Sequence, residues 1–422
     1  MVPGRMFDDL AAGGGGAPAG RFLTSVARGR HMMLLRAVAE EPSSEAVRTA
    51  FMQLARIHSA APGPVDQVVR HPAVGAWALS VVLSQGARPE AMAAVAAAAA
   101  VRAGLPLETA IPVKGGMAVL PSLGRALLGG PADEGMCTVR VASSGTTLTF
   151  EGTTVTVPPD PSADTGRWQG LRTVSAGQGR ARFCLAIDDL DPYRFPSSAA
   201  LASRLGEVDR ARWQAMLPQA WALLWRCHRA VAQELQTMVS VLTPLTPLGG
   251  WPTSGTSRTT FGCVALAPPA DATALALALA HEVQHIKLTG LLYLVDLVEP
   301  DSGDRFYAPW RHDLRPAAGL LHGVYAHLGV TGFWHRQRMV DQDDVSHAQF
   351  VRWRQATAQA AQSLLEGSVL TPLGYRFVEG VLGAVGQFGG EPVPARANEM
   401  AYRAAERHRR CYGLHTGEAP FR

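Results

Sequence analysis

Two histidines and a glutamate interrupt an otherwise apolar run, LALAHEVQHIKLTGLLYLVDLV, at residues 277–298. His281 and His285 are four residues apart, so on an α-helix they lie on one face, one turn apart. Two imidazoles placed in this way can bind one metal ion, and Glu282 can approach a water molecule on that ion. Burying unpartnered ionisable groups costs free energy, and a metal ion would remove that cost. The HExxH spacing therefore predicts a metal centre rather than two packing histidines.

A third protein ligand has to come from outside this run. A metzincin would carry a glycine and a histidine where this chain has Leu288 and Leu291, so that class is excluded. Asp296 lies 11 residues after His285. A helix would place it roughly 16 Å away, too far to bind the same ion.

The next predicted helix offers His322 and His327. They are five residues apart and point about 140° away from each other, so one orientation of the helix can aim only one of them at the metal. The His322 face carries small residues that allow close approach to the metal-binding helix: Ala318, Gly319, Ala326 and Gly329. We therefore predict His322 as the third ligand, with His327 as the alternative.

Three regions differ in their sequence pattern. Residues 1–135 are predicted to be helical, because apolar residues recur three and four positions apart. Residues 136–192 alternate and are rich in Thr and Val, which predicts a β-rich insert. Residues 193–422 are predicted to form a helical catalytic region that contains the HExxH core. The expected fold is mainly α with a β-rich insert, an α+β fold.

The segment before the metal-binding helix has a strand-like core, TFGCVALA. Asp271 follows it and is predicted to cap the helix that carries His281 and His285. A strand followed directly by the HExxH helix is the arrangement of a zincin-like catalytic core. Pro316 is predicted to lie in the first turn of the helix that carries His322.

The composition excludes several classes of protein. The net charge of +4 is small for 422 residues, and no basic segment is interleaved with aromatic residues. The basic stretch 403–410 is predicted to be a solvated helix face. A nucleic-acid partner is therefore not expected. No uncharged apolar run reaches the roughly 18 residues that span a bilayer. The N-terminal segment lacks the apolar stretch of a signal peptide. The five cysteines form no CxxC pair, so we expect a reducing, cytoplasmic location.

Three linked motifs resemble a known family. HEVQHIKLTGLLYLVDLV, RFYAPWRHDLRP and GLLHGVYAHLGVTGFW are similar to the HExxH-type peptide β-hydroxylases. These 2-oxoglutarate-dependent enzymes modify ribosomally made peptides in natural-product gene clusters. The N-terminal FDDLAAGGGGAPAGRFLTSVARGRHMMLLRAV also resembles the opening segment of the family. The resemblance covers most of the chain, although the β-rich insert matches only loosely.

The resemblance implies non-haem iron chemistry on a precursor peptide. His281, His285 and His322 would hold Fe(II), and 2-oxoglutarate and O₂ would be the cosubstrates. Imidazole suits iron as well as zinc. The distal carboxylate of 2-oxoglutarate needs a cation, for which Arg315, seven residues before His322, and Arg311 are candidates.

The residues alone leave two other functions open. The first is a zinc metallopeptidase in which Glu282 is the general base. The second is a peptide-binding scaffold whose metal site is structural or lost. The motif resemblance favours hydroxylation of a peptide β-carbon.

Overall fold

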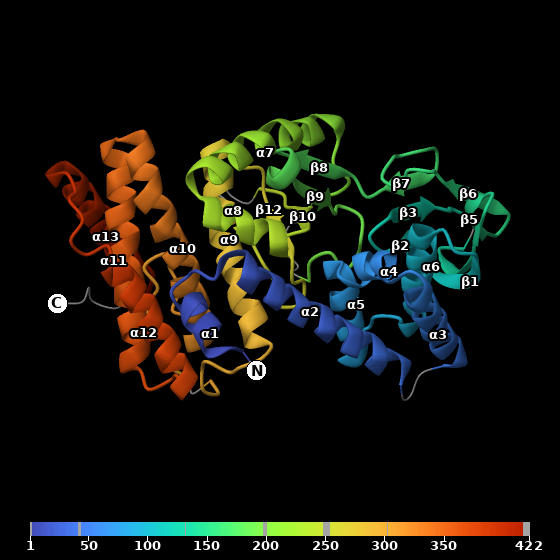
Figure 1. The fold of residues 1–422 in the computed structure, drawn as a ribbon, viewed down its shortest axis with the longest axis horizontal. Coiled ribbons are helices and arrows are strands. Elements are labelled where there is room, and N and C mark those ends of the chain that lie inside the picture. The colour runs from blue at the N-terminus through green and yellow to red at the C-terminus, as the bar shows by residue number, and fades with distance from the viewer. Residues whose placement is uncertain are drawn as a thin grey trace. The chain divides into compact units, whose positions relative to one another are not determined.

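The structure is a computed structural model that describes all residues except 1, 41–43, 131, 197–200, 248–253, 302 and 417–422, with side chains described as far as residue 412. The chain forms two compact units (Figure 1). Unit 1 comprises Met1–Leu23, Gln219–Met238 and Asp271–Arg422. Unit 2 comprises Thr24–Pro218 and Val239–Ala270. Two helices, α2 (Gly16–Ala39) and α7 (Glu207–Cys227), contribute residues to both units.

The first half of unit 2 is helical. After α2 come α3 (Glu45–Ala60), α4 (Pro62–Val69), α5 (Pro72–Val82) and α6 (Met92–Ala103). Helix α6 consists mostly of alanine, the residue with the best helix propensity, and residues 92–100 are all buried. Gly104 ends α6 with φ 64°, in the left-handed region that glycine adopts without steric cost.

A seven-stranded antiparallel sheet follows, and α6 packs against its strands β1, β2 and β4. The strands lie in the order β6-β5-β4-β1-β2-β3-β7. Their bounds are β1 (Leu107–Lys114), β2 (Met117–Leu120), β3 (Gly124–Leu127), β4 (Glu134–Ala142), β5 (Gly145–Phe150), β6 (Thr153–Val157) and β7 (Trp168–Gly170).

The predicted boundary at residue 135 is wrong, because the strands begin at Leu107. Strand β1 pairs along its whole length with β4, which was expected to lie in a separate insert. The sequence LETAIPVK contains only a few apolar residues and a proline, so its alternation is too short to be distinguished from a loop. The predicted insert 136–192 does hold strands, but they complete a sheet that starts before it.

A second, five-stranded sheet is mixed. Its order is β11-β12-β10-β9-β8, with β10 parallel to both β9 and β12 and the outer pairs antiparallel. The bounds are β8 (Thr173–Ala176), β9 (Phe183–Ile187), β10 (Val241–Pro244), β11 (Ser254–Gly255) and β12 (Cys263–Leu266). The region 193–422 therefore contributes strands as well as helices. All residues of β10 and β12 are buried, as expected for central strands of a parallel arrangement.

Unit 1 is a helical assembly. Its helices are α1 (Gly4–Ala11), the N-terminal part of α2, the C-terminal part of α7, α8 (Arg229–Met238), α9 (Ala272–Leu292), α10 (Ala317–Asp341), α11 (Asp344–Glu366), α12 (Pro372–Gly386) and α13 (Ala395–Thr416). Helix α10 packs against α9 and α11, and α11 packs against α13 (Figure 1). The α+β class is thus confirmed: helices combine with a large antiparallel sheet.

Helix α9 begins where the sequence predicts. The Asp271 side chain accepts a hydrogen bond of 2.8 Å from the backbone N–H of Ala274, so Asp271 is its N-cap. Gly329 allows α10 to approach α9 closely, because a Cβ at that position would lie 2.6 Å from Cγ of Gln284 and 3.0 Å from the carbonyl oxygen of Ala280.

Two general features accompany this fold. Among the described helices, none combines the length and the apolar composition needed to cross a bilayer. Each of the five cysteines lies in the described part of the chain and is a free thiol.

A buried ion pair anchors the side of α9 that faces α8. The Lys287 ammonium donates hydrogen bonds to Glu234 Oε1 (3.0 Å) and to the carbonyl oxygen of Gly13 (2.7 Å), and both charged side chains are almost fully buried. Burial raises the pKa of Glu234 and lowers that of Lys287, and each charge opposes the shift of the other. Gln284 also donates to Gly13. These contacts hold α9 against α8 and the segment between α1 and α2.

We expect Lys287→Met to destabilise the protein by about 3–5 kcal/mol, because it leaves the Glu234 carboxylate buried without its cation. Urea denaturation followed by circular dichroism would measure the change. The double variant Lys287→Met/Glu234→Leu should be less destabilised than the single variant, since it removes both charges. Equal stability of Lys287→Met and the unmodified protein would contradict the role assigned to this pair.

Candidate metal centre

The two histidines of the HExxH motif face each other on α9. Their Nε2 atoms are 3.2 Å apart, so that one ring donates a hydrogen bond to the other, and the ring centroids are separated by 4.8 Å. Two nitrogen atoms that each bind one ion at about 2.1 Å are separated by about 3.0–3.4 Å. His281 and His285 therefore already have the spacing of two ligands of a single ion.

Both histidines of α10 lie against this pair. The His327 ring is 5.2 Å from that of His281, and the His322 ring is 5.7 Å from that of His285. The α10 partner falls from 327 to 322 as the α9 position rises from 281 to 285, so the two helices run antiparallel. Each of the two α10 histidines thus approaches a different member of the HExxH pair.

His327 is held on several sides. Its Nδ1 is 2.8 Å from the carbonyl oxygen of Gly323, to which it donates, and this leaves Nε2 without a proton in the neutral ring. Trp310 stacks on the ring with a centroid distance of 4.1 Å and an interplanar angle of 14°, and the Trp353 ring lies 4.8 Å away. Only 7% of His327 is exposed. His322, by contrast, is half-buried, as are His281 and His285.

Burial lowers the pKa of His281, His285 and His327, which keeps these three imidazoles neutral. It lowers the pKa of His281 to about 4. It also lowers the pKa of His285 well below its usual value, with smaller contributions from the neighbouring His281 and His322. Burial and the proximity of His281 likewise lower the pKa of His327. At neutral pH the rings therefore offer lone pairs, which is the form that binds a metal ion.

Glu282 lies beside the histidine pair and is 1% exposed. Its Oε1 is 3.9 Å from Nε2 of His281. This carboxylate is therefore within reach of a water molecule or another small ligand bound next to His281.

The two candidate arginines share one carboxylate. Arg311 Nε donates to Asp313 Oδ1 (2.7 Å), and Arg315 donates to Asp313 Oδ2 (3.1 Å). Arg315 is the more buried of the two, and its guanidinium lies over Gly319 in the first turn of α10, with Nε 3.1 Å from an ideal Cβ built there. The structure thus places the Arg315 guanidinium against the first turn of α10, the helix that carries His322, and Arg311 in the more exposed loop before it.

Two of the sequence motifs meet at this site. Gly323, in GLLHGVYAHLGVTGFW, has no side chain, and a Cβ there would lie 2.5 Å from the Trp310 ring. Trp310 belongs to RFYAPWRHDLRP. A glycine in one motif therefore makes room for the tryptophan of the other, and that tryptophan stacks on His327.

Within the described part of the chain, no group of three or more His, Cys, Asp or Glu side chains is arranged as a complete metal site. At this site the nitrogen atoms of His281 and His285 have the spacing of two ligands of one ion. The donor set itself, neutral imidazoles beside a buried carboxylate, suits a divalent transition metal such as iron or zinc.

Sequence reasoning did not find every residue that shapes this site. Trp353 of α11, which contacts His327, was missed, and so was the Lys287–Glu234 pair behind α9. Trp310 could have been found, because it lies within a quoted motif. Trp353 carries no local signal, since its role depends on how α11 packs on α10.

Comparisons with known proteins give no match: no protein-family model fits this chain, and no curated protein is significantly similar to it.

Proposed function

We propose that this chain is an Fe(II)- and 2-oxoglutarate-dependent dioxygenase that hydroxylates a β-carbon in a ribosomally synthesised precursor peptide. One observation carries the proposal. The two histidines of the HExxH motif lie against two histidines of α10, and Trp310 of the RFYAPWRHDLRP motif stacks on one of those two, His327. Three motifs that are separate in the sequence thus contribute to one place. The 3.2 Å spacing of the His281 and His285 nitrogen atoms supports a single ion there.

His281, His285 and His322 are the ligands that we propose for Fe(II). All three are half-buried, so a metal ion among them could be reached by a cosubstrate and by O₂. His327 is enclosed by Trp310 and Trp353 and would instead orient His281. Bound Fe(II) would supply the oxygen chemistry that converts C–H to C–OH while 2-oxoglutarate and O₂ become succinate and CO₂.

The protein residues would bind and orient the reactants. Arg315 is the cation that we assign to the distal carboxylate of 2-oxoglutarate, with Arg311 as the alternative, and that carboxylate would take the place of Asp313. Glu282 would orient a water molecule or another ligand beside His281. Trp310 and Trp353 would exclude water from the His327 side of the site.

The proposal extends to the type of core and to the location of the enzyme. Strand β12 directly precedes α9 along the chain, which is the order of a zincin-like core. We place the activity in the cytoplasm, a reducing compartment in which the five free thiols would persist.

A zinc metallopeptidase is the second candidate function. The position of Glu282, buried and 3.9 Å from His281 Nε2, favours it, because a peptidase needs a carboxylate base beside the metal-bound water. The metal content of anaerobically purified protein separates the candidates: iron supports the dioxygenase, zinc the peptidase, and neither metal a peptide-binding scaffold.

The direct test is formation of succinate from 2-oxoglutarate by iron-loaded protein in the presence of the peptide encoded in the neighbouring gene cluster. We expect Glu282→Gln to reduce this turnover only partly, since no water has to be deprotonated for hydroxylation. A peptidase would lose all activity in the same variant, because its general base is removed. Cleavage of the peptide by the unmodified protein without 2-oxoglutarate would overturn the dioxygenase proposal.

A further inference from the structure

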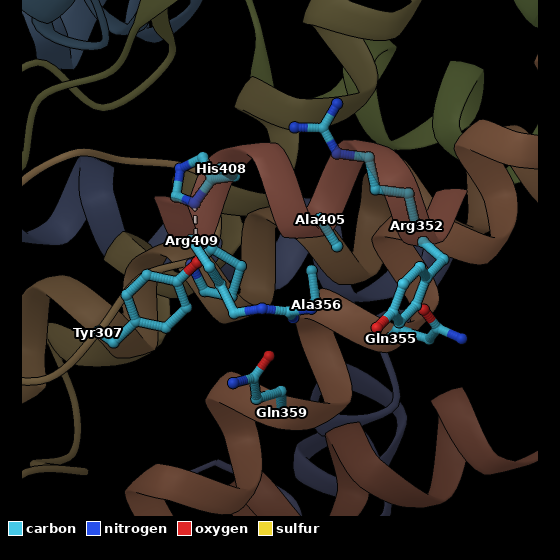
Figure 2. A pocket seen from close by; sticks show the side chains of 10 residues that line it. Tyr307, Arg352, Gln355, Ala356, Gln359, Ala405, His408 and Arg409 are labelled. Carbon is cyan, nitrogen blue, oxygen red and sulfur yellow. Dashed lines mark hydrogen bonds between the residues drawn. The ribbon is translucent and has the colours of Figure 1, made fainter. Parts of the chain in front are cut away.

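A pocket of ≈ 320 Å³ lies between the 307–309 loop, α11 and α13 (Figure 2). Ala356 of α11 and Ala405 of α13 contribute only a methyl group each to its lining, so the longer side chains around them leave space. Ligand pockets in proteins have volumes of about 300–1,000 Å³. This pocket therefore suits a small molecule or the end of a chain rather than an extended segment. We call it the Tyr307 pocket.

The lining of the Tyr307 pocket is cationic. It contains Arg352 of α11 and Arg409 of α13, and none of the described residues that line it is Asp or Glu. Burial raises the pKa of Tyr307, and the charges of Arg409 and Arg352 oppose that rise. Burial, the neighbouring His312 and the same two charges lower the pKa of His408 to about 4. At neutral pH the described lining thus carries two positive charges and no negative charge, which favours an anion.

Arg409 is available to bind a ligand. Its side chain extends from α13 towards α11 (Figure 2), and its guanidinium makes no hydrogen bond or salt bridge with another residue that the structure describes. Arg352 is held in place, because its guanidinium lies over the ring of Trp353, 4.5 Å from the centroid. A carboxylate bound to Arg409 would therefore be attracted by a second positive charge in a fixed position.

Two side-chain amides accompany these cations. Gln355 and Gln359 lie one turn apart on α11 and both line the pocket (Figure 2). Neither amide is hydrogen-bonded to another described residue. A side-chain amide can both donate and accept, so two of them can bond the N–H and the C=O of a peptide unit.

Two tyrosines add apolar surface to the lining. The Tyr307 hydroxyl is fixed by a hydrogen bond of 2.8 Å to Nδ1 of His408 (Figure 2). Tyr402 lines the same pocket and is 62% exposed. An exposed aromatic ring beside two cations offers a surface that the apolar side chain of a bound residue would cover.

The pocket lies close to the candidate metal centre. Arg352 lies over Trp353, and the Trp353 ring is 4.8 Å from that of His327. Tyr307 precedes Trp310 by three residues in the loop before α10, and Trp310 stacks on His327. A ligand in the Tyr307 pocket would thus lie beside the residues that enclose His327.

We propose that the Tyr307 pocket binds the C-terminal residue of a peptide, with its carboxylate on Arg409 and Arg352. The last peptide unit would bond to the amides of Gln355 and Gln359. A carboxylate or phosphate without an amide would use the cations alone, whereas the end of a peptide uses both kinds of group. That this peptide is the substrate rests on the function proposed above, whereas the binding itself does not.

The test is a binding measurement on the full chain without iron or 2-oxoglutarate. The probe is acetyl-Ala-Leu with a free C-terminal carboxylate, and its control is the same dipeptide with a C-terminal amide. Isothermal titration calorimetry should show that the acid binds at least about 10-fold more tightly, because charge-assisted bonds to arginine need the carboxylate. Equal binding of the two dipeptides, or no binding of the acid at about 10 mM, would overturn the proposal.

Matched variants of α13 locate the site. Arg409→Gln should weaken binding of the acid by about 10-fold, since one charge-assisted contact is lost. Arg410→Gln removes the same charge from the next residue, whose side chain is 70% exposed, pairs with Glu406 and does not line the pocket. This control should change the affinity by less than about 2-fold. Equal losses in the two variants would show only a general charge effect and would reject the pocket.

A second comparison separates the end of a peptide from a free carboxylate. Gln355→Leu/Gln359→Leu should weaken binding of acetyl-Ala-Leu by about 10-fold, because two hydrogen bonds to the peptide unit are lost. Propionate, which has no amide, should bind more weakly than the dipeptide and equally to this variant and to the unmodified protein. Propionate that binds as tightly as the dipeptide would overturn the proposal in favour of a free carboxylate.

The outcome for the Tyr307 pocket is independent of the outcome for the metal centre. If acetyl-Ala-Leu binds as expected but no succinate forms with any peptide, the pocket stands and the dioxygenase proposal fails. If succinate forms but the acid and the amide bind equally, the dioxygenase stands and the pocket is rejected.

Discussion

Iron-loaded protein should lose its metal when His285 is replaced by alanine, and we expect a fall from about one iron per chain to almost none. His285 lies between His281, whose Nε2 is 3.2 Å from its own, and the ring of His322. Loss of a residue that only orients a ligand already costs about 10–100-fold in metal affinity, so removal of a direct ligand should cost more than about 10²-fold. Anaerobic reconstitution followed by elemental analysis measures the effect, and His281→Ala should behave in the same way.

The fold should survive this change, which makes the prediction specific. His285 is only half-buried, so its truncation leaves little enclosed cavity, and the Lys287–Glu234 pair still anchors α9. His58→Ala on α3, in unit 2, is a matched control that should keep its iron. Full iron occupancy in the His285→Ala variant would show that the HExxH pair is not the metal site.

The parts of this picture that the sequence predicts are those determined locally. The HExxH spacing and the Asp271 cap are features of a single segment, and they correctly predict where α9 begins, although α9 ends at Leu292 and not near the end of the apolar run at residue 298. Strand β1 is different, because LETAIPVK becomes a strand through its long pairing with β4, which lies further along the chain. A short segment whose conformation depends on a distant partner gives little periodic signal of its own.

The same distinction applies within the candidate site. The helical wheel of α10 correctly separates His322 from His327, but it contains no information on where α9 lies beside them. Since α9 carries two histidines one turn apart, the His327 ring contacts His281 and the His322 ring contacts His285. The contacts of Trp310 and Trp353 with His327 depend on the packing of both the 305–316 loop and α11 against α10. The sequence of a single segment does not predict such packing.

The two α10 histidines differ enough in their surroundings to be tested separately. His327 stacks on Trp310, contacts Trp353 and bonds through Nδ1 to the Gly323 carbonyl, so alanine in its place would leave a cavity. Phenylalanine keeps the aromatic contacts and loses only the hydrogen bond. We therefore expect His327→Phe to keep its iron and its succinate formation and to lose about 1 kcal/mol of stability.

His322→Ala should instead lose iron and activity together while the unfolding midpoint changes little, because His322 is half-buried and is proposed to bind the metal directly. Iron content, succinate formation and urea denaturation, measured on both variants in parallel, separate a ligand from a packing residue. A ligand variant loses metal at nearly constant stability, whereas a packing variant loses stability at nearly constant metal. If His327→Phe loses iron and His322→Ala retains it, the third ligand is His327. The Nδ1 bond to Gly323 would then be what directs Nε2 of His327 toward the ion.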